Sequence, residues 1–229
     1  MPKISIIIPC FEYNGKGVEV LEYSFKKLES QTFRDYNVII SDHSMNNKIC
    51  LLCENWKYKL PIKYYLNENN RGSGSANFNF AIEHADGEYL KLLCADDYLL
   101  MDDSLKIINE NLTDGVNFLA TGYVLTKNRL EYYNAHFPQM NSRIYAINTV
   151  GTPSCVTIKN YQDLPKFDIN SNYSYDCIFY HDYINKYGGI KLINSITMAN
   201  FIWGESVTSS MTNENIEKEI RYAIEKYEN

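Results

Sequence analysis

Short apolar runs alternate with amphipathic segments along the first half of the chain. Residues 4–9 form a run rich in isoleucine, as expected of a strand that is buried on both faces. Residues 18–28 instead carry apolar side chains every three or four positions, which is the spacing of one helix face. The same reasoning predicts strands at 36–41, 62–66, 89–94 and 117–126 and a helix at 75–85. This alternation is typical of a parallel sheet covered by helices.

The pattern becomes less regular after about residue 127. Residues 154–158 still predict a short strand, and 176–187 predict a helix that a pair of glycines ends. A last amphipathic helix is predicted at 214–227, with its apolar residues on one face. Because the opposite face mixes Glu with Lys, we expect this helix to pack on the protein or on a partner rather than on a membrane.

Composition indicates a folded protein with an acidic balance. Hydrophobic residues make up 45% of the 229 positions and aromatic residues 14%, which is enough for a sizeable core in one domain spanning 1–229. The chain has 22 Lys and Arg against 28 Asp and Glu, for a formal net charge of −6. This balance provides no overall electrostatic attraction for nucleic acid, so we expect no nucleic-acid partner.

Nothing in the sequence predicts export or a membrane span. No run approaches the roughly 18 to 20 apolar residues that a transmembrane helix needs, and the N-terminus begins a strand rather than a signal peptide. The six cysteines are scattered, which suits reduced thiols better than a disulfide framework. We therefore expect a cytoplasmic protein, with peripheral contact to the inner face of the membrane as an open alternative for the last helix.

Candidate chemistry lies just after the predicted strands. In open α/β sheets, ligands bind at the carboxyl ends of the strands. Four strand ends of this chain carry polar or ring-bearing residues: 9–14, 41–44, 70–75 and 95–97. This convergence indicates a ligand site at one edge of the sheet.

The pair Asp96 and Asp97 is the most specific of these features. Adjacent carboxylates repel each other unless hydrogen-bond donors or a cation stabilise them, and Mg²⁺ or Mn²⁺ uses one or two protein carboxylates together with phosphate oxygens. The alternative is a helix cap, and a second pair, Asp102 and Asp103, precedes a helical segment and serves as a comparison. We interpret the second pair as a cap and only the first as a ligand site.

The segment 70–75 is rich in Gly and Ser and directly precedes a predicted helix, so it is a candidate anion site. It lacks the Lys-Ser/Thr of a P-loop and the full G-x-G-x-x-G spacing. By itself this signal is weak.

Together these segments resemble the family-two glycosyltransferases. The matching residues lie in the family's order and spacing: 4–14, 30–33, 38–44, 70–77, Ala81, 85–89 and 95–97. The resemblance implies the GT-A fold, a Rossmann-like mixed α/β sheet with helices on both faces, which binds a nucleotide-diphosphate sugar. It also implies a nucleotide-sugar-binding half at 1–126 and an acceptor-binding half at 127–229.

The resemblance assigns roles at the strand ends. Asp42 is expected to contact the base of the nucleotide, with the turn from Pro9 to Phe11 beside it. Asp96 is expected to face the ribose, and Asp97 to hold the Mn²⁺ or Mg²⁺ that bridges the diphosphate. Three further residues are expected to flank the nucleotide: Arg71, Gly72 and Asn77.

The chain departs from the family pattern at two of these ends. His43 follows Asp42 where the family often has a second acid, and Cys94 stands where an extra acid is frequent before Ala95. Neither change removes the pair Asp96 and Asp97.

A general base is expected in the C-terminal half. The family places this acid about eleven or twelve residues before a Gly that ends its helix, and Asp176 fits that spacing to Gly188. Asp182 is the alternative but lies too close to Gly188, and a helix cap is the alternative role for Asp176. At a helix N-terminus the macrodipole favours an ionised carboxylate, which can accept a proton.

The expected function is therefore metal-dependent, inverting transfer of a hexosyl or hexosaminyl group, with UDP-sugar as the donor implied by resemblance. The acceptor would be a hydroxyl of a glycan or lipid-linked saccharide in polysaccharide biosynthesis, next to the acceptor-like segment 151–154. Two alternatives stay open at this point: a sugar-phosphate nucleotidyltransferase, for which residues 12–16 are a poor basic loop, and a non-catalytic nucleotide-sugar-binding subunit.

Overall fold

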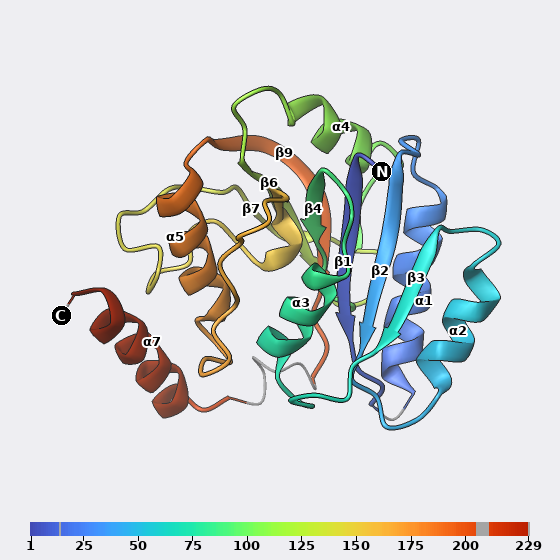
Figure 1. Cartoon of the computed structure of the whole chain (residues 1–229), viewed down its shortest axis with the longest axis horizontal. Coiled ribbons are helices and arrows are strands. Elements are labelled where there is room, and N and C mark those ends of the chain that lie inside the picture. The colour runs from blue at the N-terminus through green and yellow to red at the C-terminus, as the bar shows by residue number, and fades with distance from the viewer. Residues whose placement is uncertain (14, 205–210, 229) are drawn as a thin grey trace.

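A mixed sheet runs through the whole structure (Figure 1). The computed structural model describes residues 1–13, 15–204 and 211–228. Within these residues nine strands form one sheet in the order β3-β2-β1-β4-β8-β6-β9-β5, with β7 paired to β6 beside this path. The strands are β1 (Ile4–Cys10), β2 (Tyr36–Asp42), β3 (Ile62–Leu66), β4 (Tyr89–Leu92), β5 (Tyr98–Leu99), β6 (Phe118–Thr126), β7 (Tyr133–His136), β8 (Val156–Lys159) and β9 (Ile190–Phe201).

Helices cover both faces of the sheet. They are α1 (Lys16–Glu29), α2 (Lys48–Trp56), α3 (Gly74–Glu83), α4 (Ser104–Asn111), α5 (Tyr175–Tyr187) and α7 (Asn213–Glu228), with a short 3-10 turn at Pro153–Cys155. Apolar residues of α1, α2 and α4 pack on one face of the sheet, and those of α3 and α5 on the other. The mixed α/β fold with helices on both faces is confirmed.

Strand β1 shows why its sequence is almost wholly apolar. Ile6 and Ile8 belong to the core beneath α1 and α2, whereas Ile7 belongs to the core beneath α3 and α5. Neighbouring side chains of a strand point to opposite faces, so a strand covered on both sides must be apolar at every position. β1 pairs in parallel with β2 and β4, which brings three carboxyl ends to one edge of the sheet.

The sequence missed several elements, most of them after residue 127. β9 is the longest strand of the sheet at 12 residues, and neither it nor the short strands β5 and β7 were predicted. β9 lies parallel to β6 and antiparallel to β5, so strands from both sides of residue 127 share one sheet. All six cysteines are free, as their scattered positions predicted.

The C-terminal helix α7 packs against the segment that precedes α5 and against α5 itself. The Tyr222 hydroxyl and the Lys226 ammonium both donate to Asp168, and the Tyr227 hydroxyl donates to Asp182 at 2.7 Å. Only Ala223 of this helix is fully buried. Packing on the protein, one of the predicted placements, is therefore achieved through polar contacts and through the Tyr227 ring, which packs on Tyr145 and His181.

Among the described residues, no helix has both the length and the apolar character that crossing a membrane would require.

Candidate active site

The predicted donor residues gather where β1, β2 and β4 end, at the lower edge of the sheet in Figure 1. Cys10, the last residue of β1, lies opposite Asp42, the last residue of β2. Pro9 precedes Cys10 within β1, and Phe11 follows it with 48% of its surface exposed. The topology thus brings the first two predicted segments together.

Asp42 is completely buried at the end of β2. One carboxylate oxygen accepts the Ser44 backbone N–H at 2.8 Å, and the other accepts the Tyr64 hydroxyl at 2.9 Å. Burial raises the pKa of Tyr64, and the hydrogen bond to Asp42 adds to this rise, so the tyrosine stays protonated as a donor. The sequence did not predict Tyr64 as a partner, and base contact by Asp42 stays a prediction.

Asn77, from α3, connects the ends of two strands. Its side-chain amide donates to the carbonyl oxygens of Cys10 and Ser41 at 3.2 and 3.0 Å, and its oxygen accepts the Ser41 hydroxyl. These bonds satisfy buried groups at the edge of the sheet and hold β1 beside β2. The residue is buried, and its predicted place beside the nucleotide stays a prediction.

The loop before α3 presents Arg71 and Gly72 at the surface. Gly72 has a φ of +90°, a left-handed conformation that favours glycine. Arg71 forms an ion pair with Glu68 at 3.4 Å, and Ser73 caps α3 by accepting the Ala76 N–H at 3.2 Å. The strand-to-helix joint is therefore built as the sequence indicated, with a capped helix N-terminus.

The pair Asp96 and Asp97 is held by donors from the C-terminal half. The Trp203 indole N–H donates to Asp96 at 2.9 Å, and the Ser154 hydroxyl donates to Asp97 at 2.5 Å. Burial raises the pKa of both carboxyl groups, and the charge of Asp96 raises that of Asp97 further. Ser154 belongs to the segment that resembles an acceptor-side motif, whereas nothing local in the sequence marks Trp203 as a partner of Asp96.

A buried lysine contacts the same serine that donates to Asp97. Lys91 of β4 is fully buried, and its ammonium donates to the Ser154 carbonyl oxygen. Burial lowers the pKa of Lys91 to about 8, and Asp97 is among the nearby charges that oppose this change. The sequence pattern placed Lys91 inside a strand and gave it no role.

The acid pair fits a divalent cation in its chemistry. Burial raises the pKa of both carboxyl groups, and the charge of Asp96 adds to the rise at Asp97, so a nearby cation would stabilise their ionised form. Within the described residues, no group of three or more His, Cys, Asp or Glu side chains could hold a metal. Mg²⁺ and Mn²⁺ sites of one or two carboxylates are completed by substrate phosphates, so the pair suits an ion that arrives with a donor.

The second Asp pair provides the expected contrast. Asp103 occupies the position before α4, as predicted for a cap, although its side chain makes no capping hydrogen bond. Asp102 accepts the Ser30 hydroxyl at 2.6 Å. The pair Asp102 and Asp103 therefore lies at the start of a helix, as expected of residues with a structural role.

Asp176 lies in the first turn of α5 and is buried. One oxygen accepts the Cys177 N–H at 2.7 Å, and the other accepts the Asn148 amide at 2.8 Å. Burial raises the pKa of Asp176 to about 6, while these hydrogen bonds oppose the rise. Ser174 holds the cap position without a capping side-chain bond, whereas Asp176 accepts a first-turn N–H, so a structural role at the helix N-terminus stays an alternative for Asp176.

The charges of Asp176 and of the acid pair affect the pKa of the same side chain, Tyr175. Burial raises the pKa of Tyr175, and the carboxylates of Asp176 and of the acid pair add to this rise. Asp182 instead contacts the C-terminal helix through Tyr227. The segment 148–154 connects Asp176 with the acid pair, because Asn148 donates to Asp176 and Ser154 donates to Asp97.

The chain matches the model of the family described as "Glycosyl transferase family 2" over residues 5–174. The match covers well over half of the sequence, and the chain belongs to this family, whose GT-A fold it has.

Two bacterial relatives match part of the chain. A GalNAc(5)-diNAcBac-PP-undecaprenol beta-1,3-glucosyltransferase of Campylobacter jejuni is 34% identical over 101 residues, which is 44% of this chain and 31% of that protein. The poly(ribitol-phosphate) beta-N-acetylglucosaminyltransferase TarS of Staphylococcus aureus is 26% identical over 117 residues, 50% of this chain and 20% of that protein. The chain thus spans less than a third of the length of these relatives.

Solved structures agree over nearly the whole chain. A TarS fragment in complex with UDP-GlcNAc superposes with a TM-score of 0.73 at 18% identity, covering 97% of this chain and 66% of that one. The mannosyltransferase PcManGT of Pyrobaculum calidifontis, in complex with GDP-Man and Mn²⁺, has a TM-score of 0.71 at 13% identity, covering 98% and 64%. At these identities the likeness establishes the fold.

Proposed function

We propose that the protein is an inverting glycosyltransferase that moves a hexosyl or hexosaminyl group from a UDP-sugar to a hydroxyl of a glycan or lipid-linked acceptor. The proposal rests above all on one arrangement: a buried aspartate with a pKa of about 6, near an acid pair suited to a divalent cation. Asp176 is ionised at neutral pH and remains basic enough to accept a proton. Similarity to TarS, solved with UDP-GlcNAc, supports a UDP-sugar donor.

The side chains of the site divide the work of a single displacement. Asp176 accepts the proton of the acceptor hydroxyl while that oxygen attacks the anomeric carbon and the bond to the diphosphate breaks. Asn148 and the Cys177 N–H orient the carboxylate for this step. Asp42 and Asp96 bind the base and the ribose, beside Pro9, Phe11 and the loop that carries Arg71 and Gly72.

Asp97 would hold Mn²⁺ or Mg²⁺, oriented by Ser154. When bound, the ion supplies positive charge that stabilises the departing diphosphate. The Mn²⁺ in the PcManGT complex supports this choice of ion.

Donor hydrolysis tests the proposal directly. Purified protein incubated with UDP-GlcNAc or UDP-glucose should release UDP, about tenfold or more faster with Mn²⁺ than with EDTA, because the cation stabilises the leaving group. Release of pyrophosphate instead would indicate a nucleotidyltransferase. Binding of the nucleotide sugar without turnover, with or without a glycan acceptor, would indicate a non-catalytic subunit.

Asp42→Ala should weaken UDP binding by about 10- to 100-fold, because hydrogen bonds to charged groups contribute about 1.5–3 kcal/mol. Titration calorimetry with UDP measures the affinity, and Asp42→Asn is the isosteric companion in case the alanine variant is unstable. Tyr64→Phe is the matched control, because it removes a partner of Asp42 but retains the carboxylate. Wild-type UDP affinity in a folded Asp42 variant would contradict the base contact.

A further inference from the structure

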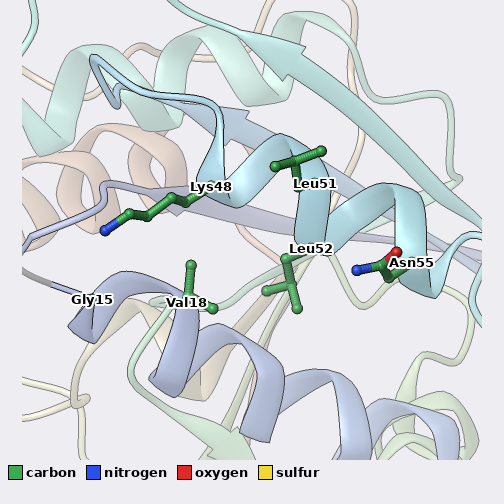
Figure 2. Close-up of a pocket in the computed structure, with 6 residues that line it drawn as sticks. All are labelled: Gly15, Val18, Lys48, Leu51, Leu52 and Asn55. Atoms are coloured by element: carbon green, nitrogen blue, oxygen red, sulfur yellow. The ribbon is translucent and has the colours of Figure 1, made fainter.

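A groove lined by both polar and apolar groups lies between the loop before α3 and the C-terminal helix α7. Its volume is ≈ 570 Å³, which is within the range of about 300–1,000 Å³ that small-molecule sites occupy. The residues that line it include Gly72, Asn170, Asn172, Asn215, Lys218 and Tyr222. It is separate from the shallow apolar pocket between α1 and α2, where Figure 2 shows Val18 and Leu52.

The groove adjoins the proposed active site on two sides. Gly72 belongs to the loop proposed to flank the donor nucleotide, and Asn172 precedes Asp176 by four residues in the same connection to α5. A molecule in this groove would therefore contact both the donor loop and the segment that leads to the base. An acceptor must likewise lie between the donor and the segment that carries the base, although Asp176 itself does not line the groove.

Glu219 of α7 makes one wall of the groove rigid. Its carboxylate accepts the backbone N–H groups of Asn172 and Tyr173 at 2.9 and 2.8 Å. It also accepts the Ser171 hydroxyl at 2.6 Å. These bonds satisfy the backbone donors before α5. They also engage the negatively charged carboxylate of Glu219 within the wall.

Three of the other polar side chains that line the groove make no such bond to a described residue. Among the described residues, no side-chain hydrogen bond or ion pair involves Asn172, Asn215 or Lys218. Tyr222 adds an aromatic ring that is only partly buried, with its hydroxyl bound to Asp168. Amide groups and an ammonium can bind sugar hydroxyls, and the C–H face of a sugar ring packs on an aromatic ring.

We propose that this groove binds a saccharide unit of the acceptor, with α7 as the wall that orients it. The inference rests on the proposed transferase function and extends it by naming the acceptor subsite. Asn172, Asn215 and Lys218 bind hydroxyl groups, and Tyr222 packs on the sugar ring. Helix α7 is thereby part of the substrate site.

The test uses an array of immobilised di- to tetrasaccharides probed with the full chain in the presence of UDP. Wild type should bind a subset of them, and Asn172→Ala and Asn215→Trp should weaken that binding at least about tenfold, by loss of a contact and by filling the groove. Arg221→Ala, an exposed residue of the same helix outside the groove, is the matched control and should bind as wild type does. Thermal unfolding midpoints confirm that each variant is folded.

Failure of the inference and of the transferase proposal can be told apart. Suppose that wild type releases UDP from a UDP-sugar. The acceptor subsite is then wrong if both groove variants bind saccharides as wild type does, and it is also wrong if wild type binds no saccharide. If Asn215→Trp weakens UDP binding and leaves saccharide binding intact, the groove belongs to the donor. If wild type releases no UDP, the transferase proposal fails independently of the groove.

Discussion

Asp176→Asn should reduce sugar transfer by about 10²- to 10⁴-fold, the range contributed by general-base catalysis. The substituted amide cannot accept the proton of the acceptor hydroxyl, although it fills the same space beside Asn148. UDP affinity should stay near that of wild type, because the residue lies on the acceptor side. Steady-state transfer kinetics and calorimetry with UDP measure the two quantities separately.

The pH dependence of wild type supplies a second measurement of the same group. Burial raises the pKa of Asp176 to about 6, so kcat/KM should increase as the pH rises through about 6 and the carboxyl group loses its proton. Asp176→Asn should lack this step.

The contribution of Asp176 to the free energy of unfolding should change with pH in the opposite direction to kcat/KM. Because the folded-state pKa of Asp176 is raised above its unfolded value, the group contributes stability at low pH that is lost as the pH rises through about 6. A neutral Asn avoids that loss. The lost acceptor opposes this gain, because Asp176 accepts both the Asn148 amide and the Cys177 N–H. The unfolding midpoint of Asp176→Asn at pH 7.5 therefore has to be measured beside the kinetics, to separate loss of catalysis from loss of folding.

Asp182→Asn is the matched control for this prediction. Asp182 accepts the Tyr227 hydroxyl from α7, and its replacement should leave transfer within a few fold of wild type. Near-normal activity of Asp176→Asn together with an inactive Asp182→Asn would move the base to Asp182.

Asp97→Asn should remove the metal dependence of donor binding and reduce UDP release by about 100-fold or more. The isosteric amide can still accept the Ser154 hydroxyl, so the local structure is retained while one negative charge is lost. Wild type should bind UDP about tenfold or more tightly with Mn²⁺ than with EDTA, and the variant should bind it equally in both. Electron paramagnetic resonance of free Mn²⁺ supplies a readout that is independent of activity.

Asp103→Asn serves as the comparison from the second acid pair. That residue lies before α4 without a capping side-chain bond, so its replacement should leave metal binding and UDP release unchanged. Equal UDP affinity of wild-type protein in Mn²⁺ and in EDTA would remove the metal assignment altogether.

Local signals were enough to predict most strands of the first half of the fold and to name candidate site residues at their ends. The strands up to β4 are short apolar runs, and the joints after them carry Asp, Asn and Gly at positions that chain topology alone brings to one edge. Asp42, Asp96 and Asp97 could therefore be assigned to strand ends at one edge of the sheet before any coordinates. The spacing of Asp176 to the glycine that ends α5 predicted its place at the start of that helix.

The same reasoning could not find β9. Its twelve residues mix apolar positions with Asn194 and Ser195, and its first half is only partly buried, so neither strict alternation nor a continuous apolar run marks it. Its pairing with β6 joins residues about 70 positions apart, a contact that no local pattern encodes. Trp203, which donates to Asp96, lies just beyond this strand and was missed as a partner for the same reason.

The sequence by itself thus determined the class of fold, the family and the carboxylates that are candidates for chemistry, because short-range periodicity and fixed motif spacing carry that information. Tertiary structure decided the contacts of each candidate: the segment 148–154 contacts both Asp176 and Asp97, whereas Asp182 contacts the C-terminal helix. It also determined the environment of each group. Burial and contacts with distant segments, such as those of Glu219 and Trp203, set the pKa of a carboxyl group and the walls of a groove, and both depend on the folded arrangement.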